Sequence, residues 1–179
     1  MNQSETTDRE LSVMEYFILA LIGKAGLTSL YAFQQRAGLQ PGGIRSALQH
    51  LESRDLITRA KSSTRRRRDM SLTAAGIACL EGTWVQCLSD HPDMEGVLRA
   101  ACVALLMGPP DCATVYLRDR AAAHLCMAME RSMEAEHMRK DRKDPLSIYA
   151  WMRMLGDGQR RNAESQAFTQ LSHFLEEKD

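Results

Sequence analysis

Aromatic residues are scarce in this sequence, which contains two Trp, four Tyr and four Phe among 179 residues. Hydrophobic residues nevertheless make up 44% of the chain, and 11 residues are Met. A core built mainly from aliphatic side chains and flexible Met residues suits helices packed on helices. The composition therefore predicts a mostly α-helical protein.

Long hydrophobic runs are also missing. A transmembrane helix needs roughly 18 or more consecutive apolar residues, and no such run occurs. The polar N-terminus lacks the basic-then-apolar order of a signal peptide. We therefore expect a cytoplasmic protein with no membrane partner.

Motifs of known catalytic chemistry are absent: there is no phosphate-binding glycine loop, no GxSxG and no HExxH. Glu134 and His137 form half of a di-iron motif, but such sites need a second copy and two further glutamates. His124 lies among alanines and is expected at the surface or in an interface. We expect neither an enzyme nor a cofactor or metal.

The cysteines are odd in number and none forms a CxxC pair, which argues against a disulfide framework. They are Cys79, Cys87, Cys102, Cys112 and Cys126. We interpret the cysteines as small hydrophobic residues that are buried in a protein of a reducing compartment, rather than as metal ligands or a redox pair.

Charge is balanced over the chain but not along it. Basic and acidic residues number 23 each, whereas the stretch from Arg36 to Arg68 carries a net charge of +7. DNA, with one negative charge about every 1.7 Å of duplex axis, is a natural partner for such a stretch. A basic run could also be a solvated loop, so its position in the fold matters.

That stretch contains the pattern of one helix and two strands. Pro41 suits the first turn of a helix, and Ile44, Leu48 and Leu51 recur with helical spacing before a predicted end near Arg54. Residues 56–59 and 70–73 read as short paired strands. The basic residues between them are expected at the exposed tip of the hairpin.

Two further helices are predicted before this stretch. The first starts at Glu10 and stops at Gly23, and the second runs from Leu30 to a stop at Gly38. Thr28 or Ser29 would cap the second helix, whose free amides could dock a DNA phosphate. Alternatively, the cap only starts the helix and has no contact with DNA.

The order of these segments resembles the winged helix-turn-helix domain of PadR-type transcriptional regulators. The resemblance covers residues 11–80 and is carried by MEYFILALI, GLTSLYAFQQ, PGGIRSALQHLESRDLIT and RRRRDMSLTAAG. It implies a DNA-binding domain with a small β-hairpin wing, and ligand-responsive repression in some members. The chain departs from the family at Gly43 and Arg45, where Thr and Tyr are common. Arg45 could read guanine directly.

The expected DNA contacts come from the second helix, the polar face of the third helix and the basic loop. They are Thr28, Ser29, Tyr31, Gly43, Arg45, Ser46, Gln49, His50, Lys61, Arg65, Arg66, Arg67 and Arg68.

Helical patterns fill the rest of the chain. Thr73 is expected to cap a helix that extends to Leu88, and residues 94–107 form another. A third runs from about residue 111 to 140 with Val115, Ala122, Leu125 and Met129 on one stripe. In the segment from residue 146 to 177, Gly156 and Gly158 could break the helix or lie within one long helix, which we favour. The predicted domains are 1–88, for DNA binding, and 89–179, for dimerisation and effector binding.

Two long amphipathic helices after a complete winged helix have too little of their own domain to cover them, which predicts a homodimer. A two-fold dimer places two reading helices about 34 Å apart, as a palindromic operator requires. The expected function is therefore a dimeric DNA-binding regulator, acting as a repressor. The alternative is a winged-helix module that binds protein or RNA without operator specificity.

A small apolar or aromatic effector is a further expectation that the sequence leaves open. The adaptable side chains that could line its pocket, or could instead form plain core, are Trp84, Met129, Met133, Trp151 and Met152.

Overall fold

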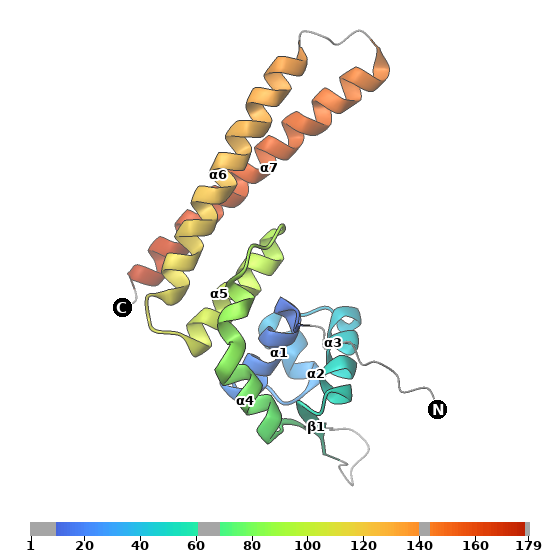
Figure 1. Ribbon diagram of the computed structural model, residues 1–179, viewed down its shortest axis with the longest axis vertical. Helices are drawn as coiled ribbons and strands as arrows, with labels where there is room; N and C mark the ends of the chain where they lie inside the picture. The colour runs from blue at the N-terminus through green and yellow to red at the C-terminus, as the bar shows by residue number, and fades with distance from the viewer. Residues whose placement is uncertain (1–9, 61–68, 140–143, 178–179) are drawn as a thin grey trace. The chain divides into compact units, whose positions relative to one another are not determined.

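The computed structural model describes residues 10–60, 69–139 and 144–177 (Figure 1). The chain divides into two compact units, Met1–Met107 and Gly108–Asp179. The first contains α1 (Val13–Gly23), α2 (Leu30–Ala37), α3 (Pro41–Ser53), β1 (Ile57–Arg59), β2 (Met70–Leu72), α4 (Ala74–Thr83), the 3-10 helix η1 (Trp84–Leu88) and α5 (Met94–Met107). The second contains α6 (Cys112–Met138) and α7 (Pro145–Glu176). No helix in the described ranges is long and apolar enough to cross a membrane.

Helix α1 is the centre of the first unit. It contacts α3, α4, α5 and β2, and all its residues from Glu15 to Ile22 are buried. Its start is fixed by a capping box in which Ser12 and Glu15 exchange hydrogen bonds. The helix therefore begins later than Glu10, where the apolar pattern placed its start.

Helices α2 and α3 follow as predicted. Ser29, not Thr28, is the N-cap of α2, and Gly38 closes that helix in the left-handed conformation with φ 64°. Pro41 occupies the first turn of α3, and Ile44, Leu48 and Leu51 are buried along one face. The opposite face of α3 is left for other contacts.

The hairpin pairs β1 with β2 in antiparallel register, with Thr58 opposite Ser71. Met70 N–H also donates to the Thr28 carbonyl at 2.8 Å, which joins the loop before α2 to the free edge of β2. The small antiparallel sheet and the surrounding helices confirm the mostly α-helical fold class with one β-hairpin.

Helix α4 crosses close to the start of the hairpin at Gly76. A Cβ atom on Gly76 would lie 2.0 Å from the Leu56 carbonyl oxygen, so only glycine fits there. Thr73 caps α4 as predicted. The α-helix ends at Thr83, however, and the chain tightens into η1 up to Leu88.

Helix α5 belongs to the first compact unit because it packs on α1. The break between compact units lies after Met107. It therefore falls later along the chain than the functional boundary expected after residue 88.

The second unit is an antiparallel pair of helices, in which Arg118 pairs with Glu176 near one end and Arg131 with Asp157 further along. Helix α7 is continuous from Pro145 to Glu176, so the interpretation as one helix is confirmed. Its Gly158 allows close approach, since a Cβ there would lie 3.2 Å from Ser132 Oγ.

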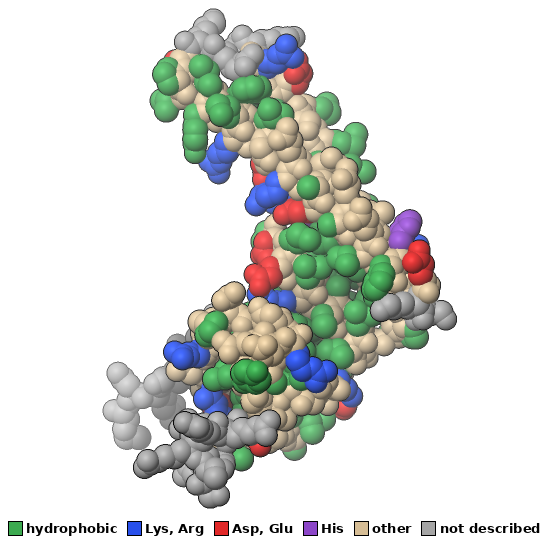
Figure 2. Space-filling model, turned by 180° about the vertical axis from the view of Figure 1, so that it is seen from behind, with side chains coloured by type: hydrophobic (Ala, Val, Ile, Leu, Met, Phe, Trp, Pro, Cys, Tyr) green, Lys and Arg blue, Asp and Glu red, His purple; other side chains and the backbone are tan. Residues whose placement is uncertain are grey.

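The face of α6 that is buried within this unit differs from the expected stripe of Val115, Ala122, Leu125 and Met129. Small residues, including Ala121 and Ala128, are buried, whereas Leu125 and Met129 are exposed. The prediction that His124 lies at the surface or in an interface is wrong: it is fully buried, with Nδ1 2.9 Å from Glu164 Oε2 and its ring edge-on to Phe168. Figure 2 shows apolar side chains on the surface of this pair.

Candidate nucleic-acid interface

The outward face of α3 brings together three of the residues predicted to contact DNA. Arg45, Ser46 and Gln49 are exposed, lie within about one helical turn of one another and stand opposite the buried stripe of the same helix. Within the described part of the chain, Arg45 makes no ion pair or hydrogen bond. Its guanidinium is therefore free to donate to an external acceptor, with up to five N–H groups.

His50 has a different environment from these three residues. Its Nδ1 lies 2.5 Å from Glu15 Oε1, and the side chain of Glu15, in the first turn of α1, is buried. The second oxygen of Glu15 accepts hydrogen bonds from Ser12 N at 2.6 Å and Ser12 Oγ at 2.8 Å. The contact ties α3 to α1, which gives His50 a structural role that spacing along α3 did not suggest.

Gly43 lies beside α1 as well. A Cβ atom there would be 3.6 Å from Met14 Cε, an ordinary van der Waals distance. Tyr31 in the first turn of α2 is 71% exposed, so its ring is available to a partner. Both positions are exposed, but only Tyr31 offers a side chain to a partner.

The loop before α2 is used internally. Ser29 Oγ accepts a hydrogen bond from Ala32 N at 3.2 Å, and Thr28 Oγ1 lies 3.5 Å from Asp69 Oδ1. Both side chains therefore shape the junction between α2 and the hairpin. The backbone amides at the start of α2 are the part of this junction suited to an anionic group.

The base of the hairpin carries polar groups on its exposed face. Thr58 Oγ1 and Ser71 Oγ lie 2.9 Å apart, and Arg59 Nε pairs with Glu52 Oε1 at 2.6 Å. This ion pair links β1 to the last turn of α3. The predicted contacts at Lys61, Arg65, Arg66, Arg67 and Arg68 lie outside the described residues.

Tyr16 connects α1 to the segment that follows the hairpin. Its hydroxyl lies 2.8 Å from both Thr83 Oγ1 and Gln86 Oε1. Burial raises the pKa of Tyr16 above its ordinary value, so the phenol stays protonated and can donate to either oxygen.

The five cysteines are unbonded and lie in different environments. Cys87 is buried, and burial raises the pKa of the Cys102 and Cys112 thiols. Among the described residues, no cluster of three or more His, Cys, Asp or Glu is arranged to hold a metal ion.

The residues predicted to line an effector pocket are divided between the two compact units. Trp84 belongs to the first unit and the other four to the second. Met129 and Met133 line a groove of about 360 Å³ with Gln159 and Asn162, whereas Trp151 and Met152 are not among its lining residues.

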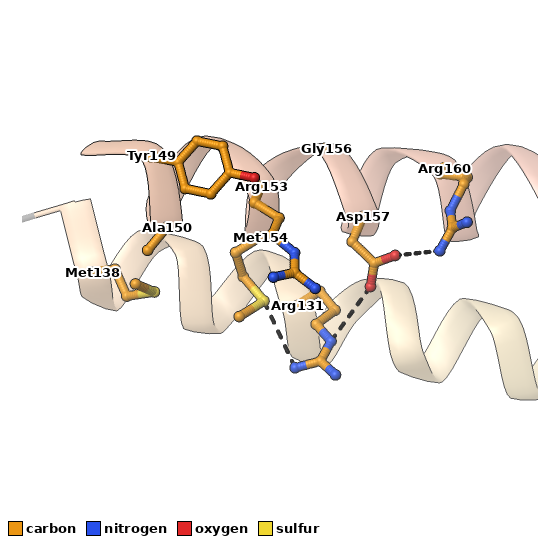
Figure 3. Close-up of a pocket in the computed structure, with 9 residues that line it drawn as sticks. All are labelled: Arg131, Met138, Tyr149, Ala150, Arg153, Met154, Gly156, Asp157 and Arg160. Atoms are coloured by element: carbon orange, nitrogen blue, oxygen red, sulfur yellow. Dashed lines mark hydrogen bonds and ion pairs between the residues drawn. The ribbon is translucent and has the colours of Figure 1, made fainter. Parts of the chain in front are cut away.

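A second groove on the α6–α7 pair was not predicted. We call it the arginine groove; it is lined mainly by Arg131, Met138, Arg153, Met154, Gly156 and Arg160 (Figure 3). The residues at positions 153, 157 and 160 lie on one face of α7, and Arg131 joins them from α6. Spacing along α7 could have suggested the cluster, but not its partner from α6.

No protein-family model and no curated protein sequence matches this chain. The assignment of function therefore rests on the geometry of these surfaces and on the sequence.

Proposed function

We propose that the protein is a sequence-specific DNA-binding transcriptional regulator that represses from a palindromic operator as a homodimer. The observation that carries the proposal is the exposed polar face of α3, where Arg45, Ser46 and Gln49 stand opposite the buried stripe. Arg can pair with guanine and Gln with adenine in a major groove.

The order of elements supports this use of α3. In helix-turn-helix proteins the second helix of the motif enters the major groove, with its N-terminal residues nearest the bases. Helix α3 follows α2 after a short turn that Gly38 begins, and Arg45 lies in the N-terminal half of α3.

The hairpin supplies the second part of the argument. It follows α3 directly, and Arg59 is held against Glu52 of α3. The sequence between its strands contains Lys61 and the four arginines from 65 to 68. A group of cations there would contribute sequence-independent attraction to phosphates.

The homodimer is argued from the exposed surface of α6. Val115, Leu125, Met129 and Met133 are 50%, 44%, 59% and 73% exposed, and Leu125, Met129 and Met133 recur every four residues. Covering such a stripe is favourable by roughly 25 cal/mol for each Å² of apolar surface. A second copy of the same stripe is a self-complementary partner.

Binding to the DNA upstream of the protein's own gene tests the function. A gel-shift titration should show saturable binding that survives an excess of nonspecific competitor DNA. A module that binds protein or RNA would instead lose its DNA to the competitor, which would contradict the proposal.

The dimer is tested by sedimentation of a variant with Leu125→Glu and Met129→Glu. Carboxylates placed in an apolar interface are costly to bury, so this variant should sediment as a monomer. Gln170→Glu adds a charge at an exposed position of α7 and is the matched control. An intact dimer in the double variant would place the interface elsewhere.

A further inference from the structure

The arginine groove combines excess positive charge with an apolar floor. Its volume is about 690 Å³, within the range of roughly 300 to 1,000 Å³ typical of small-molecule sites. It lies along α6 and α7 within the second unit, and it is open to solvent on one side.

The charges in the groove do not cancel. Asp157 is the one acid among the lining residues, and it lies between two arginines, 2.5 Å from Arg160 Nη2 and 3.5 Å from Arg131 Nε (Figure 3). Arg153 has no ion pair or hydrogen bond with the rest of the described chain. Three guanidinium groups thus face one lining carboxylate, and Glu134, outside the lining, also pairs with Arg131. One positive charge remains in excess, which suits an anionic ligand.

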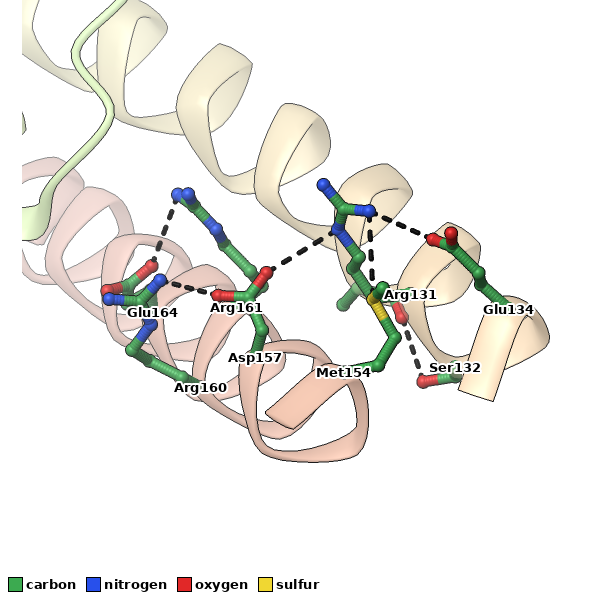
Figure 4. Close-up of polar contacts among 9 residues, drawn as sticks. Arg131, Ser132, Glu134, Met154, Asp157, Arg160, Arg161 and Glu164 are labelled. Atoms are coloured by element: carbon green, nitrogen blue, oxygen red, sulfur yellow. Dashed lines mark hydrogen bonds and ion pairs between the residues drawn. The ribbon is translucent and has the colours of Figure 1, made fainter. Parts of the chain in front are cut away.

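The surrounding network holds Arg131 in place. Arg131 Nη1 donates to Glu134 Oε2 at 2.9 Å on its own helix and to Met154 Sδ at 3.7 Å on α7 (Figure 4). The guanidinium is therefore positioned before any ligand arrives, which reduces the ordering cost of binding.

Apolar atoms provide the rest of the lining. Met138 and Met154 contribute flexible thioethers, which adapt to apolar and aromatic shapes. Tyr149 adds an exposed ring, and Gly156 leaves part of the wall without a side chain. A bare phosphate or a DNA backbone would have no use for this apolar surface.

We propose that the arginine groove binds a small organic anion, in which one carboxylate or phosphate is attached to an apolar body. Arg153 contacts the anionic group, and the methionines contact the body. Binding at this site does not depend on whether α3 contacts DNA, so the two proposals can fail separately.

Two matched probes test the proposal: 2-naphthoate, which is an anion, and 2-naphthylmethanol, which has the same ring and no charge. The full chain is labelled with ¹³C at the methionine methyl groups, and each probe is titrated while the methyl signals are recorded. Ring currents of the probe report directly on nearby methyl groups. Met129 and Met133, which line the other groove, serve as internal controls.

Naphthoate should shift the Met138 and Met154 signals saturably and leave Met129 and Met133 unchanged. It should bind at least about ten-fold more tightly than the alcohol, as expected for one charge-assisted hydrogen-bonded contact. Equal affinities for the two probes, or equal shifts in both grooves, would overturn the proposal.

Two kinds of variant locate the site. Arg153→Gln should weaken naphthoate binding by about ten-fold and leave the alcohol unaffected. Arg118→Gln, about 20 Å along α6 from Arg131 at 1.5 Å per residue, should change neither affinity.

Gly156 offers a variant that fills the groove without harming the helix. A Cβ at this position meets no heavy atom within 4 Å, and both Ala and Leu favour the helix over glycine. Gly156→Leu should abolish binding of both probes, whereas Gly156→Ala should preserve most of it. Unchanged naphthoate binding in Gly156→Leu, with circular dichroism showing intact helices, would place the ligand elsewhere.

Discussion

His50 Nδ1 lies 2.5 Å from Glu15 Oε1, and this contact joins the proposed reading helix α3 to the central helix α1. Glu15 is 4% exposed, so its carboxylate depends on His50 and Ser12 for hydrogen bonds. The orientation of α3 is therefore fixed from its C-terminal half, while Arg45 in the N-terminal half stays free.

Removing the imidazole should destabilise the first unit. His50→Ala leaves one oxygen of a buried carboxylate without its partner, which costs about 1 to 3 kcal/mol in free energy of unfolding. Urea unfolding followed by circular dichroism measures the change. Gln49→Ala, at the neighbouring exposed position, should stay within about 0.5 kcal/mol of the parent. Equal effects of the two substitutions would mean that the contact contributes nothing.

Gly76 and Gly82 provide a second matched pair, both within α4. Gly76→Ala would place a Cβ 2.0 Å from the Leu56 carbonyl oxygen, so the backbone must move, and we expect a loss of at least about 3 kcal/mol. Gly82→Ala meets no atom within 4 Å and should gain about 0.5 to 1 kcal/mol from helix propensity. Thermal unfolding of both variants measures the difference. A tolerated Gly76→Ala would contradict the close crossing.

Local signals in the sequence were sufficient for most of the first unit. Thr73 marked the start of α4, and the apolar spacing of Ile44, Leu48 and Leu51 gave the buried face of α3. These features depend on residues within one or two helical turns. The role of His50 was missed because its partner Glu15 is 35 residues away, on another helix.

The second unit was predicted less well, for a physical reason. The large apolar residues of α6 were expected to form a stripe that a partner subunit covers, and the face that packs within the unit was not identified. Close helix packing selects small residues for that face, so Ala121 and Ala128 face inwards. His124 shares that face and pairs with Glu164 from α7. Only the relative register of two helices, which a single sequence does not reveal, brings such residues together.

Asp144 makes the start of α7 sensitive to pH. The backbone N–H groups of Ser147 and Leu146 donate to its carboxylate and lower the pKa of Asp144 below its ordinary value. A lowered pKa in the folded state stabilises the protein above the unfolded-state pKa, and this contribution is lost as pH falls through the folded-state pKa.

Asp144→Asn removes the negative charge but keeps a capping side chain, because Asn also caps helices well. The parent should be more stable than this variant near neutral pH, and the difference should disappear as the pH falls below about 4. Urea unfolding at several pH values measures it. Asp111→Asn is the control, since Asp111 occupies the N-cap of α6 without a side-chain capping hydrogen bond. A difference for Asp144→Asn that stays constant with pH would contradict a charge-dependent cap.

Substitutions of Arg45 distinguish the reading of DNA sequence from nonspecific attraction to DNA. A guanidinium in the N-terminal half of α3 can contact guanine O6 and N7, which discriminates against a wrong base by about 1 to 3 kcal/mol. The alternative is a phosphate contact, which positions the helix without reading sequence. The two differ in how a substitution affects binding to operator and to scrambled DNA.

Arg45→Ala and Arg45→Lys should be titrated on both DNAs at one fixed salt concentration, because phosphate contacts make affinity depend on salt. If Arg45 reads a base, the Ala variant loses operator affinity by the stated 1 to 3 kcal/mol and keeps its affinity for scrambled DNA. Lys should rescue only in part, since it cannot reproduce the planar fork of Arg. Equal losses on both DNAs would make Arg45 a phosphate contact and leave base reading to Ser46 and Gln49, its exposed neighbours on α3.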